Sequence, residues 1–161
     1  MIGCWFEDND ASTSGGGIYS RYGAPSITDT MFMGNTSKYN AGGMVLEDAA
    51  GQTLVEDCVF DSNTSTWGGG GIAIFSSDIT ITNSQFLNNT GRNGGGINYY
   101  GPSNLYSGVV RNCTIKNNTA TDSGPGGGVD SSGSSHLEVH DSVICGNVPT
   151  AVWGVSTASS G

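Results

Sequence analysis

The sequence is poor in charged residues, and the charge that it has is mostly negative. Only 12% of its 161 residues are charged, and 14 acids against five bases leave a net charge of −9. Binding to nucleic acid or to an anionic lipid surface requires a cationic face. The composition therefore predicts no nucleic-acid partner and no attraction to an anionic membrane surface.

Long apolar runs and prolines are also scarce. No stretch approaches the roughly 18 apolar residues of a membrane-spanning helix, so no membrane span is expected. Four prolines are too few for a disordered proline-rich linker. The first eight residues lack the basic and apolar regions of a secretory signal. The protein is therefore either cytosolic, or a mature domain or a piece of a longer protein, and we expect the second.

Glycine is abundant, at 27 residues, and falls in short blocks that belong to an internal repeat. The motif F-x-x-N occurs four times and is followed by two copies with Ile in place of Phe. Successive asparagines lie 26, 28, 26, 29 and 29 residues apart, and they are Asn9, Asn35, Asn63, Asn89, Asn118 and Asn147. In phase with them, a glycine block precedes one apolar residue in five copies, at Ile18, Met44, Ile72, Ile97 and Val129. Two motifs in phase indicate a solenoid.

The residues between the motifs favour strands over helices. Gly, Asn, Ser and Thr interrupt every repeat, so no stretch is long enough for a helical repeat. Three short strands per repeat fit instead, and tight turns would return the chain to its start about 4.8 Å further along the axis. The sequence therefore predicts an all-β parallel β-helix of about six coils, with repeats over 1–147 and a C-terminal cap or tail over 148–161.

Stacked coils place equivalent residues in columns. The aromatic of F-x-x-N and the apolar residue after the glycines form columns that we expect to face the core. The six asparagines are expected to form a ladder at a turn, where each amide donates to a carbonyl of the next coil. Asparagine also tolerates the left-handed conformation of a sharp corner. The last glycine of each block suits a positive φ or a close approach between coils.

The glycine block in phase with F-x-x-N resembles the polymorphic outer-membrane protein repeats of bacterial surface autotransporters, within the pectate-lyase-like β-helix superfamily. The resemblance covers the chain from Phe6 to about Trp153. It implies a right-handed coil, an extracellular or cell-surface location, and a role in adhesion or scaffolding. We therefore expect a non-enzymatic structural or adhesive module of a secreted or cell-surface bacterial protein. A carbohydrate-binding or polysaccharide-cleaving domain is the alternative.

Exposed aromatic residues supply the candidate binding surface. We expect these residues, together with Arg21, on the outer face of the strand after the glycine block and in the insertion that follows, so the candidates are Tyr19, Arg21, Tyr22, Phe75, Tyr100 and Tyr106. Aromatic rings on one face can stack on sugars or dock a surface protein. The same side chains could instead only shield a glycine-rich sheet. End-to-end self-association through exposed strand edges is a further expectation where caps are missing.

The polar residues predict no catalytic residue, no metal site and no cofactor. Family lyases place several aspartates on one outer sheet, whereas the acids here are scattered. His136 and His140 alternate on one expected strand, which suits a solvated pair better than catalysis or zinc binding. Cys4, Cys58 and Cys113 fall in one column two coils apart, about 9.6 Å. Because a disulfide needs Cα atoms within roughly 7 Å, we expect free thiols.

Overall fold

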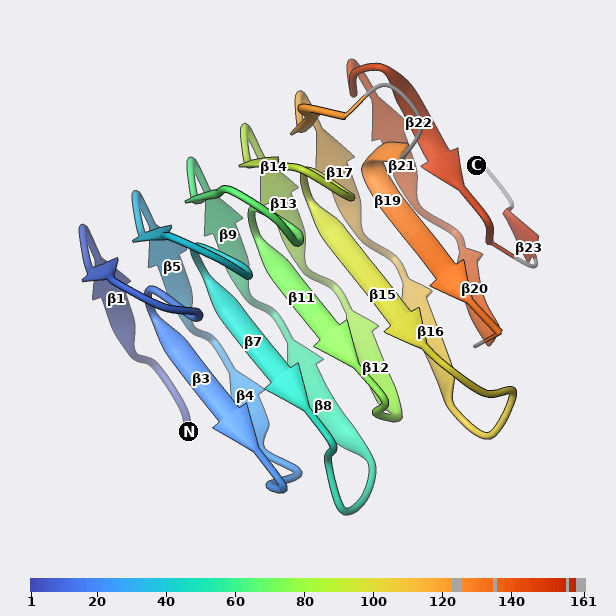
Figure 1. Ribbon diagram of the computed structural model, residues 1–161, viewed down its shortest axis with the longest axis horizontal. Coiled ribbons are helices and arrows are strands. Elements are labelled where there is room, and N and C mark those ends of the chain that lie inside the picture. Colours follow the sequence, from blue (N-terminus) through green and yellow to red (C-terminus); the bar gives the residue numbers. More distant parts are fainter. Residues whose placement is uncertain (123–125, 135, 156, 159–161) are drawn as a thin grey trace.

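The computed structural model describes residues 1–122, 126–134, 136–155 and 157–158, and it shows a parallel β-helix. The coils follow one another along the long axis from the N-terminal to the C-terminal end (Figure 1). Strands of successive coils pair in parallel and in register, as Phe32 does with Phe60 and Phe60 with Phe86. Six strands in the longest sheets are separated by five steps, so the rod has about five turns. The expected number of six coils counted the six copies of the motif. Six copies enclose only five full repeats, which agrees with the five turns of the rod.

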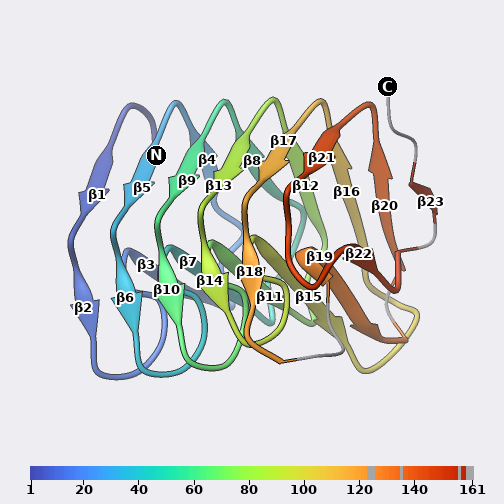
Figure 2. The ribbon, with the colours of Figure 1, turned by 90° about the horizontal axis from the view of Figure 1, so that it is seen from above.

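Each coil contributes to four sheets, which we name by their first strands. The β1 sheet contains β1 (Trp5–Glu7), β5 (Met31–Met33), β9 (Val59–Asp61), β13 (Gln85–Leu87), β17 (Thr114–Lys116) and β21 (Val143–Cys145). The β2 sheet contains β2 (Asp10–Ala11), β6 (Thr36–Ser37), β10 (Thr64–Ser65), β14 (Thr90–Gly91) and β18 (Thr119–Ala120). Figure 2 shows the β1 and β2 strands following one another within each coil.

The other two sheets close each coil. The β3 sheet contains β3 (Ile18–Arg21), β7 (Met44–Glu47), β11 (Ile72–Phe75), β15 (Ile97–Gly101), β19 (Gly126–Gly133) and β22 (Thr150–Trp153). The β4 sheet contains β4 (Ser26–Thr28), β8 (Thr53–Glu56), β12 (Ile79–Thr82), β16 (Ser107–Arg111), β20 (His136–His140) and β23 (Thr157–Ala158).

The β2 sheet corrects the expectation of three strands per coil, because it adds a fourth. Its strands have two residues each, too short for an alternating pattern to show in the sequence. The segment expected as a cap also forms strands: β22 pairs with β19 and β23 pairs with β20. Residues 156 and 159–161 of that expected cap lie outside the described residues.

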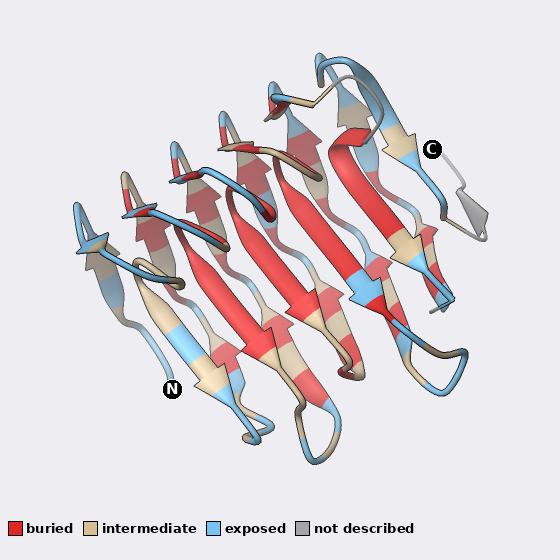
Figure 3. Cartoon of the chain, in the orientation of Figure 1, coloured by how far each residue is buried: buried red, intermediate tan, exposed pale blue. Residues whose placement is uncertain are grey.

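The core consists of the apolar columns that face the axis. Phe32, Phe60 and Phe86 are fully buried, and their rings stack with centroids 4.5 and 4.7 Å apart. From the opposite sheet, Met44, Ile72 and Ile97 are buried in register with one another. Figure 3 shows that burial is concentrated in the middle coils. Parallel register explains this core, because it gives each coil the same inward positions.

The corner beside the β1 sheet is held by the asparagine ladder. The Asn63 amide donates to the backbone carbonyl of Phe32 in the preceding coil and to the Asn89 side-chain carbonyl in the next. The left-handed residue at this corner is not the ladder asparagine, as we expected, but the residue before it, such as Ser62 with φ 58° or Asn88 with φ 54°. The ladder asparagine is thereby free to point its amide inward.

The last glycine of each block, in the turn before the β3 sheet, does not have a positive φ. Glycine is required there because neighbouring coils approach too closely for a side chain. A Cβ built on Gly43 would lie 2.4 Å from the carbonyl oxygen of Gly71 and 2.9 Å from Cδ1 of Phe60. Backbone therefore packs directly on backbone and on the phenylalanine stack at this corner. The glycine block is thus a steric requirement of neighbouring coils.

Candidate functional site

The outer face of the β3 sheet is partly covered by the turns that precede it. Val45 and Ala73 point outward from β7 and β11, but both are buried, and they pack with the fully buried Ala41 of the preceding turn. The turns themselves stack through backbone hydrogen bonds, from Trp67 N to Tyr39 O and from Asn93 N to Trp67 O, both at 3.0 Å. A wall of stacked turns therefore runs along one side of this face.

A groove lies beside this wall and consists of two adjoining hollows of about 220 and 250 Å³. Both hollows are lined by Asn40, Phe75 and Tyr100. The first, which we call the acidic hollow, is completed by Glu47, Asp48, Ser76 and Pro102. The second, which we call the amide hollow, is completed by Trp67, Gly68, Asn93, Asn98 and Ser132.

The aromatic centre of the groove comes from two neighbouring strands. Phe75 ends β11 and pairs in register with Tyr100 of β15, and the two rings are tilted by 58° with centroids 6.5 Å apart. Phe75 packs against the cluster of Ala41, Val45 and Ala73, whereas Tyr100 is 43% exposed. The pair therefore combines a ring anchored on the sheet with a ring open to solvent.

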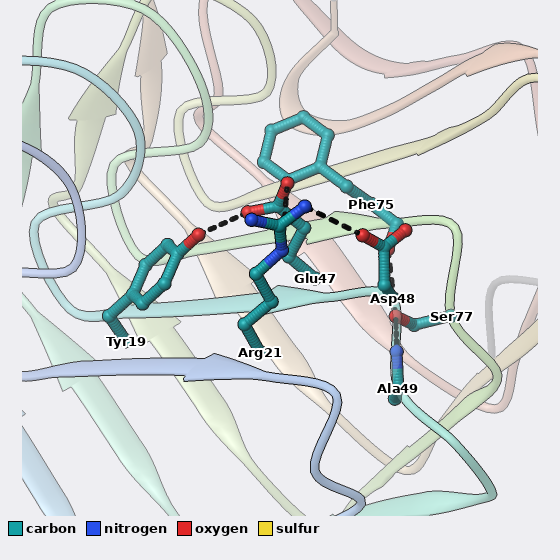
Figure 4. A network of polar contacts seen from close by, with 7 residues as sticks. All are labelled: Tyr19, Arg21, Glu47, Asp48, Ala49, Phe75 and Ser77. Carbon is teal, nitrogen blue, oxygen red and sulfur yellow. Dashed lines mark hydrogen bonds and ion pairs between the residues drawn. The ribbon is translucent and has the colours of Figure 1, made fainter.

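Tyr19 and Arg21 of β3 are bound to the acidic residues at one end of this groove (Figure 4). The Tyr19 hydroxyl donates to Glu47, which raises the pKa of that tyrosine. The Arg21 guanidinium lies 3.8 Å from Glu47 and 3.4 Å from Asp48. Arg21 and Glu47 are paired in register on β3 and β7, and Asp48 is a second carboxylate partner of Arg21. Tyr19 and Arg21 thus position carboxylates and do not themselves line the hollows.

Tyr22 and Tyr106, the remaining candidates, lie outside both hollows. Tyr22 has a positive φ of 62° at the corner after β3, and the Arg21 guanidinium lies 4.6 Å from its ring centroid. Tyr106 is half-buried in the turn before β16, where its carbonyl accepts a hydrogen bond from His136 N. Of the six candidates, the structure therefore brings only Phe75 and Tyr100 together in the groove.

Trp67 and three asparagines are groove residues that were not among the candidates. Trp67 is half exposed in the turn wall, and the Arg92 guanidinium lies 4.5 Å from its ring centroid. The turns before the glycine blocks carry Tyr39, Trp67 and Asn93 at equivalent positions, and this register could have indicated a column. The sequence gives no signal, however, that these turns fold over the sheet.

Asn98 joins the groove to a buried carboxylate behind it. Its amide donates to Asp130 of β19 at 3.0 Å, and both residues are 3% exposed. Burial raises the pKa of the Asp130 carboxyl, while hydrogen bonds from Ser132, Asn98 and the Gly126 backbone oppose that rise. The Asn98–Asp130 hydrogen bond therefore fixes the orientation of one amide at the groove.

Outside the groove, the two histidines share one carboxylate partner. Glu138 of β20 contacts both His136 and His140, at 3.1 and 2.9 Å. Among the described residues, no group of three His, Cys, Asp or Glu side chains is placed to hold a metal ion. In the same part of the chain, no helix is long and apolar enough to cross a bilayer.

The cysteines are free thiols, with Cys58 and Cys113 buried and Cys145 exposed.

Comparison with known families supports the architecture. A family model described as a right handed beta helix region matches residues 3–144, which is most of the chain. It confirms the predicted fold class and the right-handed coil that the repeat resemblance implied. No curated protein and no solved structure matches the chain.

Proposed function

Because the chain belongs to the right-handed β-helix family, we propose that it is a non-enzymatic adhesive module of a secreted or cell-surface bacterial protein, and that its groove holds a glycan. The observation that carries this proposal is the pair of hollows around Phe75 and Tyr100 on the outer face of the β3 sheet. The rod supplies rigidity, because each coil is hydrogen-bonded to its neighbours along four sheets. Rigid elements present a binding surface without a large ordering cost.

The chemistry of the groove suits sugar rings. The faces of aromatic side chains pack against the apolar C–H faces of sugars, and here Trp67, Phe75 and Tyr100 provide them. Asparagine amides can donate to and accept from sugar hydroxyls, and Asn40, Asn93 and Asn98 lie beside the rings. Each hollow is smaller than the roughly 300–1,000 Å³ of an enclosed small-molecule pocket. Two shallow, adjoining hollows suit an extended chain that lies across several coils.

The state of the carboxylates favours binding over cleavage. Glu47 and Asp48 line the acidic hollow, and both interact with Arg21. Glycoside hydrolysis requires one carboxylic acid and one carboxylate on opposite sides of the scissile bond. Asp130, whose pKa is raised, is buried behind Asn98 and does not line either hollow. The described lining residues therefore give the groove an acceptor-rich end and no opposed catalytic pair.

Affinity electrophoresis in gels that contain soluble glycans tests the proposal, with release of new reducing ends followed in parallel. We expect retardation by at least one glycan, no new ends, and loss of retardation in Tyr100→Ala and Trp67→Ala. Trp5→Ala is the matched control, because Trp5 is 68% exposed but lies on the β1 sheet. Equal loss in Trp5→Ala, or no retardation by any glycan with a folded protein, would contradict the proposal. Release of new ends would identify an enzyme instead.

A further inference from the structure

The charges around the groove are distributed unevenly. Two carboxylates, Glu47 and Asp48, line the acidic hollow, whereas none of the described Lys or Arg side chains lines either hollow. Arg21, at one end of the groove, contacts both of these carboxylates. Glu47, Asp48 and Arg21 together therefore carry one negative charge at this end of the groove.

The cations beside the turn wall are likewise engaged with neighbours. Arg92 lies over the Trp67 ring and 3.3 Å from Asp122, and Lys38 lies 5.5 Å from the Tyr39 ring centroid. On the other side, Asp130 adds a carboxyl group behind Asn98. A ligand in the groove would thus meet aromatic rings, amides and carboxylates, and the two arginines described beside it, Arg21 and Arg92, are each paired with a carboxylate.

From this distribution we propose that the groove selects an uncharged glycan and rejects uronate- or sulfate-bearing glycans, and that Glu47 and Asp48 determine this specificity. The inference rests on the proposed function and names the ligand class of the same site. Like charges in contact across an interface are strongly unfavourable, and the repulsion acts mainly between charges that lie close together. At physiological ionic strength the Debye length is about 8 Å, so distant charges of the chain are screened. The charges at the groove therefore determine whether a charged glycan is repelled.

The acidic residues can be neutralised with little change of shape. Glu47→Gln keeps an oxygen that can accept from the Tyr19 hydroxyl. Asp48 has a φ of 50°, and asparagine adopts that left-handed conformation readily. In the double variant Glu47→Gln/Asp48→Asn, Arg21 would be left without its carboxylate partners. The local charge would change from −1 to +1 at nearly constant geometry.

The test is calorimetric titration at about 0.15 M salt with neutral β-glucan, xylan and mannan oligosaccharides and with oligogalacturonate. The wild-type protein is expected to bind at least one neutral oligosaccharide and not oligogalacturonate. The double variant should retain the neutral ligand and gain oligogalacturonate affinity by about tenfold or more. Adding Arg21→Gln to the double variant should remove that gain, and Asp48→Asn alone should give a smaller one.

The matched control is Glu56→Gln/Asp57→Asn. Glu56 ends β8 and Asp57 follows it at the corner with a φ of 52°, as Glu47 ends β7 and Asp48 follows it, and the net charge changes by the same amount. No gain of oligogalacturonate affinity is expected there, and an equal gain would overturn the inference in favour of a net-charge effect. Oligogalacturonate binding by the wild-type groove would overturn it as well, while leaving glycan binding itself intact. If no glycan of either class binds the folded protein, the proposed function fails and this inference fails with it.

Discussion

The side-chain amide of Asn89 donates a hydrogen bond to the backbone carbonyl of Phe60 in the preceding coil, at 2.9 Å. The same amide donates to the Asn118 side-chain carbonyl at 3.0 Å. The Asn89 carbonyl in turn accepts from the backbone and side chain of Asn63. One fully buried side chain thus connects three coils and also satisfies the carbonyl of a residue in the phenylalanine stack.

Replacing Asn89 by alanine is therefore expected to destabilise the rod strongly. The change removes one donor from the Phe60 carbonyl, and it leaves the Asn63 backbone N–H and one hydrogen of the Asn63 amide without their acceptor, at about 1–3 kcal/mol for each buried unsatisfied group. We expect urea unfolding to give a loss of about 3 kcal/mol or more. Asn9→Ala is the control, because Asn9 is the exposed first member of the ladder and should lose under about 1 kcal/mol. Similar losses at both positions would show that the ladder does not act through buried hydrogen bonds.

The requirement for glycine at the turn before the β3 sheet can be tested with two alanine substitutions. Gly43→Ala places a Cβ 2.4 Å from a backbone oxygen of the next coil, and the coils must separate to accept it. We expect a loss of about 1–3 kcal/mol, as for other overpacked sites. At Gly51 the nearest atom to the new Cβ is 3.7 Å away, so Gly51→Ala should be neutral or stabilise by up to about 1 kcal/mol. Differential scanning calorimetry of the two variants measures the contrast, and equal melting temperatures would contradict it.

The pH dependence of stability should include a contribution from Glu138. Hydrogen bonds with His140 and then His136 lower the pKa of this carboxyl below its ordinary 4.5. A lowered folded pKa gives stability that is present above the unfolded pKa and is lost as the pH falls through the folded pKa. Urea midpoints of Glu138→Gln should therefore lie below those of the wild type at pH 6, and the gap should close as the pH approaches 3. Glu56→Gln serves as the control, and a gap that persists at low pH would exclude this linkage.

Thiol reactivity should follow the burial of the cysteines. Burial raises the pKa of Cys113 to about 11 and also raises that of Cys58, so little thiolate forms at either position at pH 8. Cys145 is exposed and should react at once with a disulfide reagent such as DTNB, whereas Cys58 and Cys113 should react only on unfolding. Cys145→Ser should remove the fast phase except for any contribution from the half-buried Cys4, which Cys4→Ser would remove. Rapid reaction of the buried thiols in the native protein would mean that the core opens locally.

The repeat period was sufficient to predict the coil and its core because parallel, in-register stacking is a local rule. Once F-x-x-N and the glycine block were in phase, Phe60 had to lie beside Phe32 and Phe86, and Ile72 beside Met44 and Ile97. The free cysteines follow from the same register, since Cys58 and Cys113 are separated by a coil that carries Ser84 at the equivalent position. Strand pairing of this kind needs only the repeat and the spacing between coils.

The two-residue β2 strands and the left-handed corner residues were harder to predict. Ser62 and Asn88 adopt positive φ although neither position contains glycine, because the ladder asparagine that follows must turn inward. Nothing in residue type alone separates these two neighbours, since Asn88 and Asn89 are identical side chains with opposite roles.

The sequence by itself determined the period, the inward columns, the ladder and the exposure of Tyr100. Only the tertiary structure decided that a groove exists, because the groove depends on the path of the turns that carry Asn40, Trp67 and Asn93. These turns fold over the β3 sheet through the packing of Ala41 on Val45 and Ala73, contacts that involve outward positions of neighbouring coils. A strand pattern distinguishes inside from outside but does not say which outside positions another segment covers. Which outer positions are covered depends on contacts between segments that are distant in the sequence. Here those contacts turn an open sheet face into a groove.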